Sequence, residues 1–339
     1  MVLRRRLGGA AWRPSGVRPG GRSDLVPGRL RIRINSRIAF TLPNMDPLSV
    51  VVRRGGVVEA RHRVHAVAVE GGAVIAEAGN PGLVCFMRSS SKPLQAIPLA
   101  RARDDVDDRD LAIASASHLA DPAQLEAVRA LLAKAPAEEQ ELECGAEGSP
   151  PRKLSHNCSG KHAGMLALCR AKDWPLVGYR LAEHPCQQAM LAEVAALTST
   201  KEMPTAIDGC GVLTFALPLD RMALAFTRID EAVADAMRAH PELIRGPRGL
   251  DTNLMQALRG WMAKGGAEGL LCAAGPGGLG FALKAEDGAS RALRPALGAF
   301  LERLGLDGSA FGPVPVRNSR DEVVGQVAAW GKKISHACG

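Results

Sequence analysis

Ser-His-Asn-Cys-Ser-Gly-Lys-His-Ala-Gly-Met, residues 155–165, stands directly before an apolar segment with helical periodicity. The stretch packs small residues, a thiol, two imidazoles and an ammonium into a few positions. Such polar density at a helix N-terminus suits a functional site better than a hydrophobic core. Cys158 and Lys161 are three residues apart, so a helix that begins here places both on one face. Composition alone leaves a glycine-rich capping loop as an equally good explanation.

A second candidate lies upstream, where Ser89-Ser90-Ser91-Lys92-Pro93 has the composition of a helix start. Ser89 and Lys92 share one helical face, so the Lys92 amine can reach the Ser89 hydroxyl. A serine needs a base to become a nucleophile, and a lysine whose pKa is lowered by desolvation can serve. Serine β-lactamases and penicillin-binding proteins use this S-x-x-K arrangement. Short matches also arise by chance, and a solvated helix N-terminus capped by Ser90 or Ser91 is the alternative.

Three shorter segments carry further reactive side chains. In Asp-Gly-Cys-Gly, residues 208–211, glycines leave the backbone of Cys210 unshielded and an acid lies two residues away. Residues 114–118, Ala-Ser-Ala-Ser-His, form a small-residue run that can hide a second catalytic hydroxyl. Lys264 precedes two glycines, where a plain helix C-cap is the alternative, because lysine is favourable in a last turn. The chain has neither an H-E-x-x-H motif nor paired C-x-x-C motifs, the common zinc patterns.

Hydrophobic periodicity predicts strands at both ends of the folded region and helices between them. The expected strands span residues 48–54, 63–69, 73–78, 270–274, 279–285 and 322–329. The expected helices span residues 121–132, 160–171, 184–198, 230–240, 251–264 and 290–304. This order predicts an α/β fold in which one sheet is built from both chain ends and a helical lobe is inserted.

Charge and composition divide the chain into three parts. The net charge of +8 comes from residues 1–44, which hold ten arginines and a single acid, so the remainder is close to neutral. This leader can be a disordered basic arm, a targeting peptide, or translated sequence ahead of a true start at Met45. We expect the last, since the first strand pattern begins at about Pro47. Residues 45–330 are expected to form one two-lobed catalytic domain, with 331–339 as an appended tail.

The same numbers exclude several classes of partner. A nearly neutral body calls for no nucleic acid, and no apolar run approaches the roughly 20 residues of a membrane helix. The eight cysteines form no dense framework and no export signal precedes them, so free thiols in a reducing cytoplasm are the expectation.

These segments together resemble the rhizobial-type, zinc-containing L-asparaginase II family, which is related in fold to serine β-lactamases and glutaminases. The resemblance is carried by residues 88–93, 116–118, 156–165, 208–211 and 264–269. Of these, the run at 156–165 is nearly diagnostic by itself. The resemblance implies a β-lactamase/glutaminase-like architecture and a homodimer.

The resemblance also implies the roles of individual residues. It implies two Ser-Lys pairs that face one pocket: Ser89, the nucleophile, with Lys92, and Ser117 with Lys264. It implies substrate-binding roles for Arg88 and Asp208.

The implied metal is a Zn²⁺ ion held by Cys158, Lys161 and Cys210 together with a solvent molecule. Two thiolates suit this ion. A lysine can bind it only when neutral, a state that the metal itself enforces by competing with the proton.

The expected activity is hydrolysis of L-asparagine to L-aspartate and ammonia through an acyl-enzyme. The nearest alternative is an L-glutaminase or another serine amidohydrolase of the same architecture, because one methylene changes discrimination by only about 1–3 kcal/mol. A more distant alternative is a non-catalytic, zinc-stabilised module. That alternative would need none of the four serine and lysine side chains of the two Ser-Lys pairs.

Overall fold

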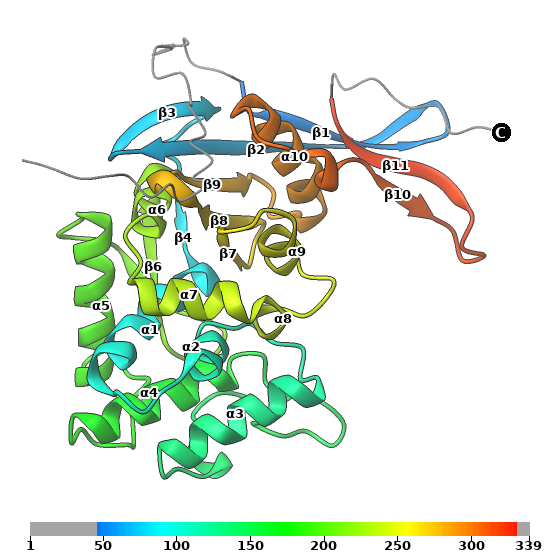
Figure 1. The fold of residues 1–339 in the computed structure, drawn as a ribbon. Helices are drawn as coiled ribbons and strands as arrows, with labels where there is room; N and C mark the ends of the chain where they lie inside the picture. The colour runs from blue at the N-terminus through cyan, green and yellow to red at the C-terminus, as the bar shows by residue number, and fades with distance from the viewer. Residues whose placement is uncertain (1–45, 331–339) are drawn as a thin grey trace, which may run out of the picture. The chain divides into compact units, whose positions relative to one another are not determined.

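The computed structural model describes residues 46–330, and Figure 1 shows how its helices and strands are arranged. The expected leader, residues 1–44, and the expected tail, residues 331–339, lie outside the described residues. None of the helices within 46–330 has the length and apolar character that a membrane span needs.

One antiparallel sheet of eight strands is assembled from both ends of the described chain. Its order is β10-β11-β1-β2-β9-β8-β7, and β3 pairs with the second half of the long strand β2. The strands are β1 (Leu48–Arg54), β2 (Val57–Glu70), β3 (Ala73–Ala78), β7 (Met262–Gly266), β8 (Leu270–Ala274), β9 (Gly280–Ala285), β10 (Val314–Arg317) and β11 (Val323–Ala329). The predicted sheet from two distant parts of the sequence is therefore confirmed.

The centre of this sheet is buried. Strands β8 and β9 are buried along their whole length, which accounts for their almost unbroken apolar sequence. Helix α6 (Leu219–Phe226) packs on β2, β8 and β9, and helix α10 (Leu293–Arg303) packs on β1, β9 and β11. Burial of these apolar side chains provides the main favourable free energy of the fold.

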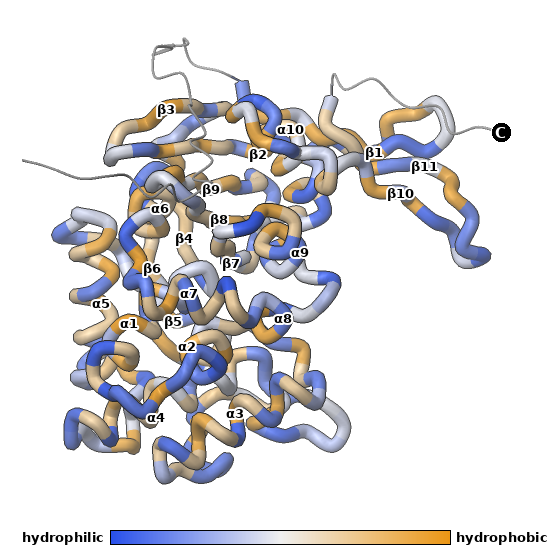
Figure 2. The backbone as a smooth tube through the Cα atoms, in the orientation of Figure 1, coloured by the Kyte–Doolittle hydropathy of each residue, from blue (hydrophilic) through white to orange (hydrophobic). Residues whose placement is uncertain are grey.

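Helices fill most of the sequence between the two groups of strands, as predicted. They are α1 (Lys92–Ala102), α2 (Asp108–Ala114), α3 (Pro122–Lys134), α4 (Ser159–Ala171), α5 (Pro185–Thr198), α7 (Glu231–Ala239), α8 (Pro241–Ile244) and α9 (Leu250–Ala257). Helix α3 begins where its sequence indicates: Pro122 is its first residue, and Asp121 and Gln124 form a capping box around it. Figure 2 shows hydrophobic and polar residues alternating along α3, as an amphipathic helix requires.

A small three-stranded sheet, β4-β6-β5, joins the helices to the larger sheet and was not predicted from the sequence. Its strands are β4 (Val84–Phe86), β5 (Thr205–Ile207) and β6 (Leu213–Pro218). Strand β4 leads into the serine-rich segment 88–91, and the turn between β5 and β6 carries residues 208–211. The small sheet therefore positions two of the sequence motifs.

The prediction of one helix over residues 251–264 is wrong. Helix α9 ends at Ala257, Leu258 takes an extended conformation, and β7 begins at Met262. A left-handed Gly260, with φ of +81°, turns the chain between them. Lys264 consequently lies in the middle of a strand, paired with Cys272 of β8, and is no helix C-cap.

Candidate active site

The segment that carries Ser89 enters its helical turn through a left-handed residue. Arg88 has φ of +50°, a conformation that is costly for a residue other than glycine. Its backbone N–H donates to Thr214 Oγ1 at 3.0 Å, and its Nε donates to Asp208 Oδ1 at 2.5 Å. These contacts to β6 and to the β5–β6 turn hold the strained backbone that precedes Ser89.

Of the three consecutive serines, only Ser89 lines a cavity. The Ser90 hydroxyl donates to Met87 O and the Ser91 hydroxyl to Arg88 O, each at 2.8 Å, and both serines are buried. Ser89 is half-buried and lies in the wall of a cavity of about 530 Å³, a volume typical of small-molecule sites. Its hydroxyl is thus the one of the three that is open to a ligand.

Lys92 is fully buried beside this cavity. Its Nζ donates to Ala116 O at 2.6 Å and to Ser117 Oγ at 2.9 Å, and burial lowers its pKa. Within residues 46–330 no hydrogen bond joins Lys92 to Ser89. Ser117, expected to act with Lys264, lines the same cavity as Lys264 and is hydrogen-bonded to Lys92.

Lys264 projects from β7 into the same cavity and is buried. Its Nζ donates to Gly265 O at 2.9 Å and lies 3.4 Å from Asp251 Oδ2. Burial lowers the pKa of Lys264 to about 8; Asp251 opposes this shift, while Lys92 and Arg245 add to it. An amine with such a pKa exists in both protonation states near neutrality, as a proton-transfer group requires.

A glycine allows β7 to approach the serine segment closely. A Cβ on Gly266 would lie 2.6 Å from Met87 O, well inside contact distance. Any larger residue would push β7, and with it Lys264, away from the turn that carries Ser89. In the Lys264-Gly265-Gly266 sequence, the lysine supplies the amine in the cavity, and Gly266 allows the close packing of β7 against the serine segment.

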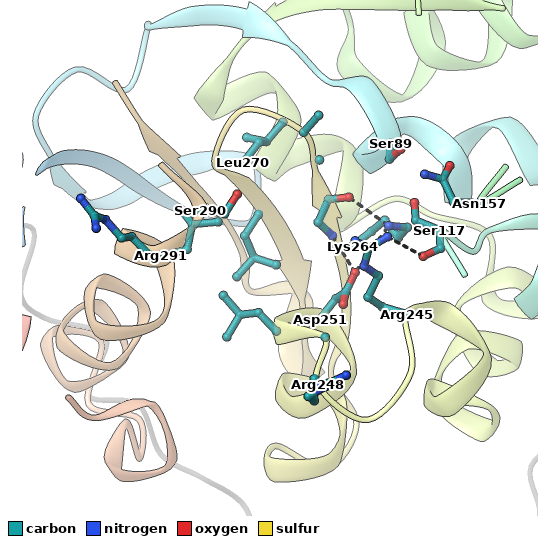
Figure 3. Close-up of a pocket in the computed structure, with 17 residues that line it drawn as sticks. Ser89, Ser117, Asn157, Arg245, Arg248, Asp251, Lys264, Leu270, Ser290 and Arg291 are labelled. Atoms are coloured by element: carbon teal, nitrogen blue, oxygen red, sulfur yellow. Dashed lines mark hydrogen bonds and ion pairs between the residues drawn. The ribbon is translucent and has the colours of Figure 1, made fainter. Parts of the chain in front are cut away.

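Figure 3 shows the arrangement of the cavity wall. Ser89, Ser117, Asn157, Lys264 and Arg245 gather on one side, and Ser290 and Arg291 lie on the other.

The sequence analysis assigned no role to two residues that the structure places at this site. Asp251 accepts hydrogen bonds from the Lys264 amine and, at 3.1 Å, from the backbone N–H of Gly265. Arg245 donates to Ser117 O at 2.9 Å. The short acidic and basic motif at 245–251 is the only sequence signal that could have singled them out.

The residues expected to bind zinc converge behind Lys92. Cys158 is the N-cap of α4, Lys161 is in its first turn, and Cys210 lies in the β5–β6 turn. Lys161 Nζ donates to Cys210 Sγ at 3.1 Å, and all three side chains are buried. A hydrogen bond from the Cys210 thiol lowers the pKa of Cys158.

This donor set fits a zinc ion. Two sulfurs and one amine meet at one point, and deprotonation of the amine would free a third ligand for the metal. Within 46–330 no cluster of three or more His, Cys, Asp and Glu side chains could hold a metal, so the lysine is essential to any such site.

Arg88 and Asp208, expected to bind substrate, form an ion pair with each other instead of facing the cavity. Asp208 Oδ1 also accepts the backbone N–H of Gly209 at 2.8 Å. The pair connects the turn of Ser89 to the turn of Cys210.

A comparison with protein families matches residues 50–329 to the model of L-asparaginase II. This range includes every segment described above as part of the site. A search of the curated proteins finds no match to the chain.

Proposed function

Since this chain belongs to the L-asparaginase II family, an amidohydrolase family, we propose that it hydrolyses L-asparagine to L-aspartate and ammonia. The observation that carries the proposal is the buried Lys92 amine beside the cavity, three residues after the half-buried Ser89 and 2.9 Å from Ser117 Oγ. A buried amine with a lowered pKa that is hydrogen-bonded to one hydroxyl and one helical turn from another can activate a serine nucleophile.

In the proposed reaction Ser89 Oγ attacks the side-chain carboxamide carbon of asparagine. Lys92 accepts the hydroxyl proton in its neutral form, which burial favours by lowering the Lys92 pKa. The Ser117 hydroxyl then passes its proton to the leaving nitrogen and takes the proton of the Lys92 ammonium in exchange, and ammonia departs from a β-aspartyl ester of Ser89. Water hydrolyses the ester: Lys264 accepts a proton from the water and returns a proton to Ser89 Oγ as aspartate leaves. Backbone N–H groups, among them that of Ser89, stabilise the oxyanion.

The proposal also covers the architecture, the oligomeric state and the cellular compartment of the protein. We propose that the antiparallel sheet with its helical region is a β-lactamase/glutaminase-like architecture, and that the protein is a cytoplasmic homodimer. The supporting observation for the architecture is the S-x-x-K turn at the boundary between helices and sheet, with a second lysine on β7.

We propose that Cys158, Lys161 and Cys210 hold a zinc ion. The metal would supply a fixed positive charge near Lys92 and a cross-link between the start of α4 and the β5–β6 turn. None of the three lines the cavity, which supports a structural and electrostatic task for the metal.

Cys210→Ser is therefore expected to lower bound zinc strongly, because a hydroxyl is a poor substitute for one of only three protein ligands. Metal analysis of the purified variant measures this directly. Cys169→Ala, a change to another buried cysteine of α4, is the matched control and should keep the wild-type zinc content. Wild-type zinc in Cys210→Ser would exclude the proposed site.

The pH dependence of turnover tests the task of Lys264. We expect kcat to rise with pH through the Lys264 pKa of about 8, because hydrolysis of the acyl-enzyme needs the neutral Lys264 amine as its proton acceptor. Asp251 raises that pKa, so Asp251→Asn should move the rise to lower pH. Asp235→Asn, which removes an exposed acid paired with Arg238, should leave the profile in place. An unchanged profile in Asp251→Asn would show that another group titrates.

Two assays test the proposed substrate: ammonia release with asparagine and glutamine, and ring opening followed by absorbance with a β-lactam. We expect asparagine to be the preferred substrate of the three. Preference for glutamine would make the protein a glutaminase, and turnover of none of the three would overturn the proposal.

A further inference from the structure

The cavity wall is predominantly basic. Four of the side chains that line it carry a basic group and one carries a carboxyl group. These are Arg245, Arg248, Lys264 and Arg291 on the basic side, and Asp251 on the acidic side. Free asparagine is a zwitterion that presents one ammonium and one carboxylate group. The basic wall therefore complements the carboxylate of asparagine better than its ammonium group.

The single acid is already engaged by the protein. Asp251 Oδ2 accepts from Gly265 N at 3.1 Å and from Lys264 Nζ at 3.4 Å, and its Oδ1 accepts from Thr252 N at 3.1 Å. Asp208, the other candidate, pairs with Arg88 away from the cavity. No other carboxylate among the described residues lines the cavity.

The basic side chains are less fully engaged by hydrogen bonds within the protein than Asp251 is. Arg291 donates to His62 Nε2 at 3.0 Å, and Figure 3 shows its guanidinium pointing away from Lys264. Arg245 is half-buried, and one of its guanidinium nitrogens donates to Ser117 O. Arg248 is exposed at the cavity wall and makes no hydrogen bond or ion pair with any residue in 46–330. The guanidinium of Arg248, with the remaining nitrogens of Arg245, is free for a ligand.

A glycine fixes the segment that presents these two arginines. A Cβ on Gly249 would lie 2.5 Å from the Arg245 side chain and 2.8 Å from Asp251 Oδ1. The tight passage brings Arg245 and Asp251 together at the wall beside Lys264. Arg248 directly precedes this glycine and lines the same cavity.

We infer that the cavity selects its substrate by a carboxylate bound to Arg248 and Arg245, and that it does not require an α-ammonium group. Guanidinium groups bind carboxylates through paired, charge-assisted hydrogen bonds. The inference rests on the proposed amidase function and extends its substrate class to β-carboxamides of carboxylic acids. The class contains asparagine, its deaminated analogue succinamate, and N-acylated asparagine.

The test compares three amides with the zinc-loaded wild-type enzyme. Succinamate lacks only the amino group of asparagine, and β-alaninamide lacks only the carboxylate. We expect kcat/KM for succinamate within about tenfold of that for asparagine, and a loss of roughly 10- to 100-fold for β-alaninamide, as for a lost hydrogen bond to a charged group.

Arg248→Ala locates the effect. It should raise KM for asparagine and succinamate by roughly tenfold or more at nearly constant kcat, and leave β-alaninamide unchanged. Arg259→Ala removes another exposed arginine that does not line the cavity and should behave as the wild type. Equal use of β-alaninamide and succinamate, or an unchanged KM in Arg248→Ala, would overturn the inference while asparagine turnover persists. Absence of turnover of asparagine itself would overturn the proposed function and the inference with it.

Discussion

Ser89→Ala is expected to reduce asparagine turnover by about 10⁴-fold or more, the loss found when a serine nucleophile is removed. Ser89 is the only one of the three consecutive serines whose hydroxyl is open to the cavity. The substitution removes one oxygen from a half-buried side chain, so the free energy of unfolding should change by less than about 0.5 kcal/mol. Steady-state ammonia release and thermal unfolding measure the two quantities.

Ser90→Ala is the matched control for this experiment. The Ser90 hydroxyl donates to Met87 O in the interior, so its loss should cost some stability and little turnover. Turnover that survives in Ser89→Ala and collapses in Ser90→Ala or Ser117→Ala would assign the nucleophile to another serine.

Lys92→Met should lower kcat by about 10²- to 10⁴-fold, the usual contribution of a positioned acid–base group. Methionine matches the length of lysine and suits the buried position, but it cannot donate to Ala116 O and Ser117 Oγ. The expected result is a folded protein of somewhat lower stability with wild-type KM and a greatly reduced kcat. Steady-state kinetics and circular dichroism check it.

Lys172→Met, a change at an exposed lysine that ends α4, should leave both kinetic constants unchanged. A Lys92→Met enzyme with kcat within tenfold of the wild type would contradict the proposed base. It would direct attention to Lys264 as the group that deprotonates Ser89.

Sequence reasoning works well where the structure is decided locally. The helix expected over 121–132 begins at a cap formed by Asp121 and Gln124, and the strands expected at 63–69 and 73–78 are joined by a turn at glycines 71 and 72. The same reasoning fails over 251–264, where apolar residues at helical spacing continue past the end of α9. Lys264 is in a strand because β8 pairs with that segment, a contact that no local pattern contains.

The same distinction holds for the candidate site: residues in local motifs could be predicted from the sequence, whereas contacts between distant segments could not. The resemblance to a family predicted Ser89, Lys92, Cys158 and Cys210 as site residues, because each lies in a short contiguous motif that can be recognised in the sequence. The hydrogen bond between Lys92 and Ser117 depends on how the chain after α2 folds over α1, so spacing could not reveal it. The contact between Asp251 and Lys264 likewise joins a helix start to a strand.

The central claim is that Ser89 forms a β-aspartyl ester during hydrolysis of asparagine. Rapid acid quench of the enzyme with excess asparagine, followed by peptide mass spectrometry, tests it most directly. The account predicts one aspartyl adduct on the peptide that contains Ser89, and no adduct in Ser89→Ala. An adduct on the peptide that contains Ser117, or full turnover without any trapped adduct, would contradict it.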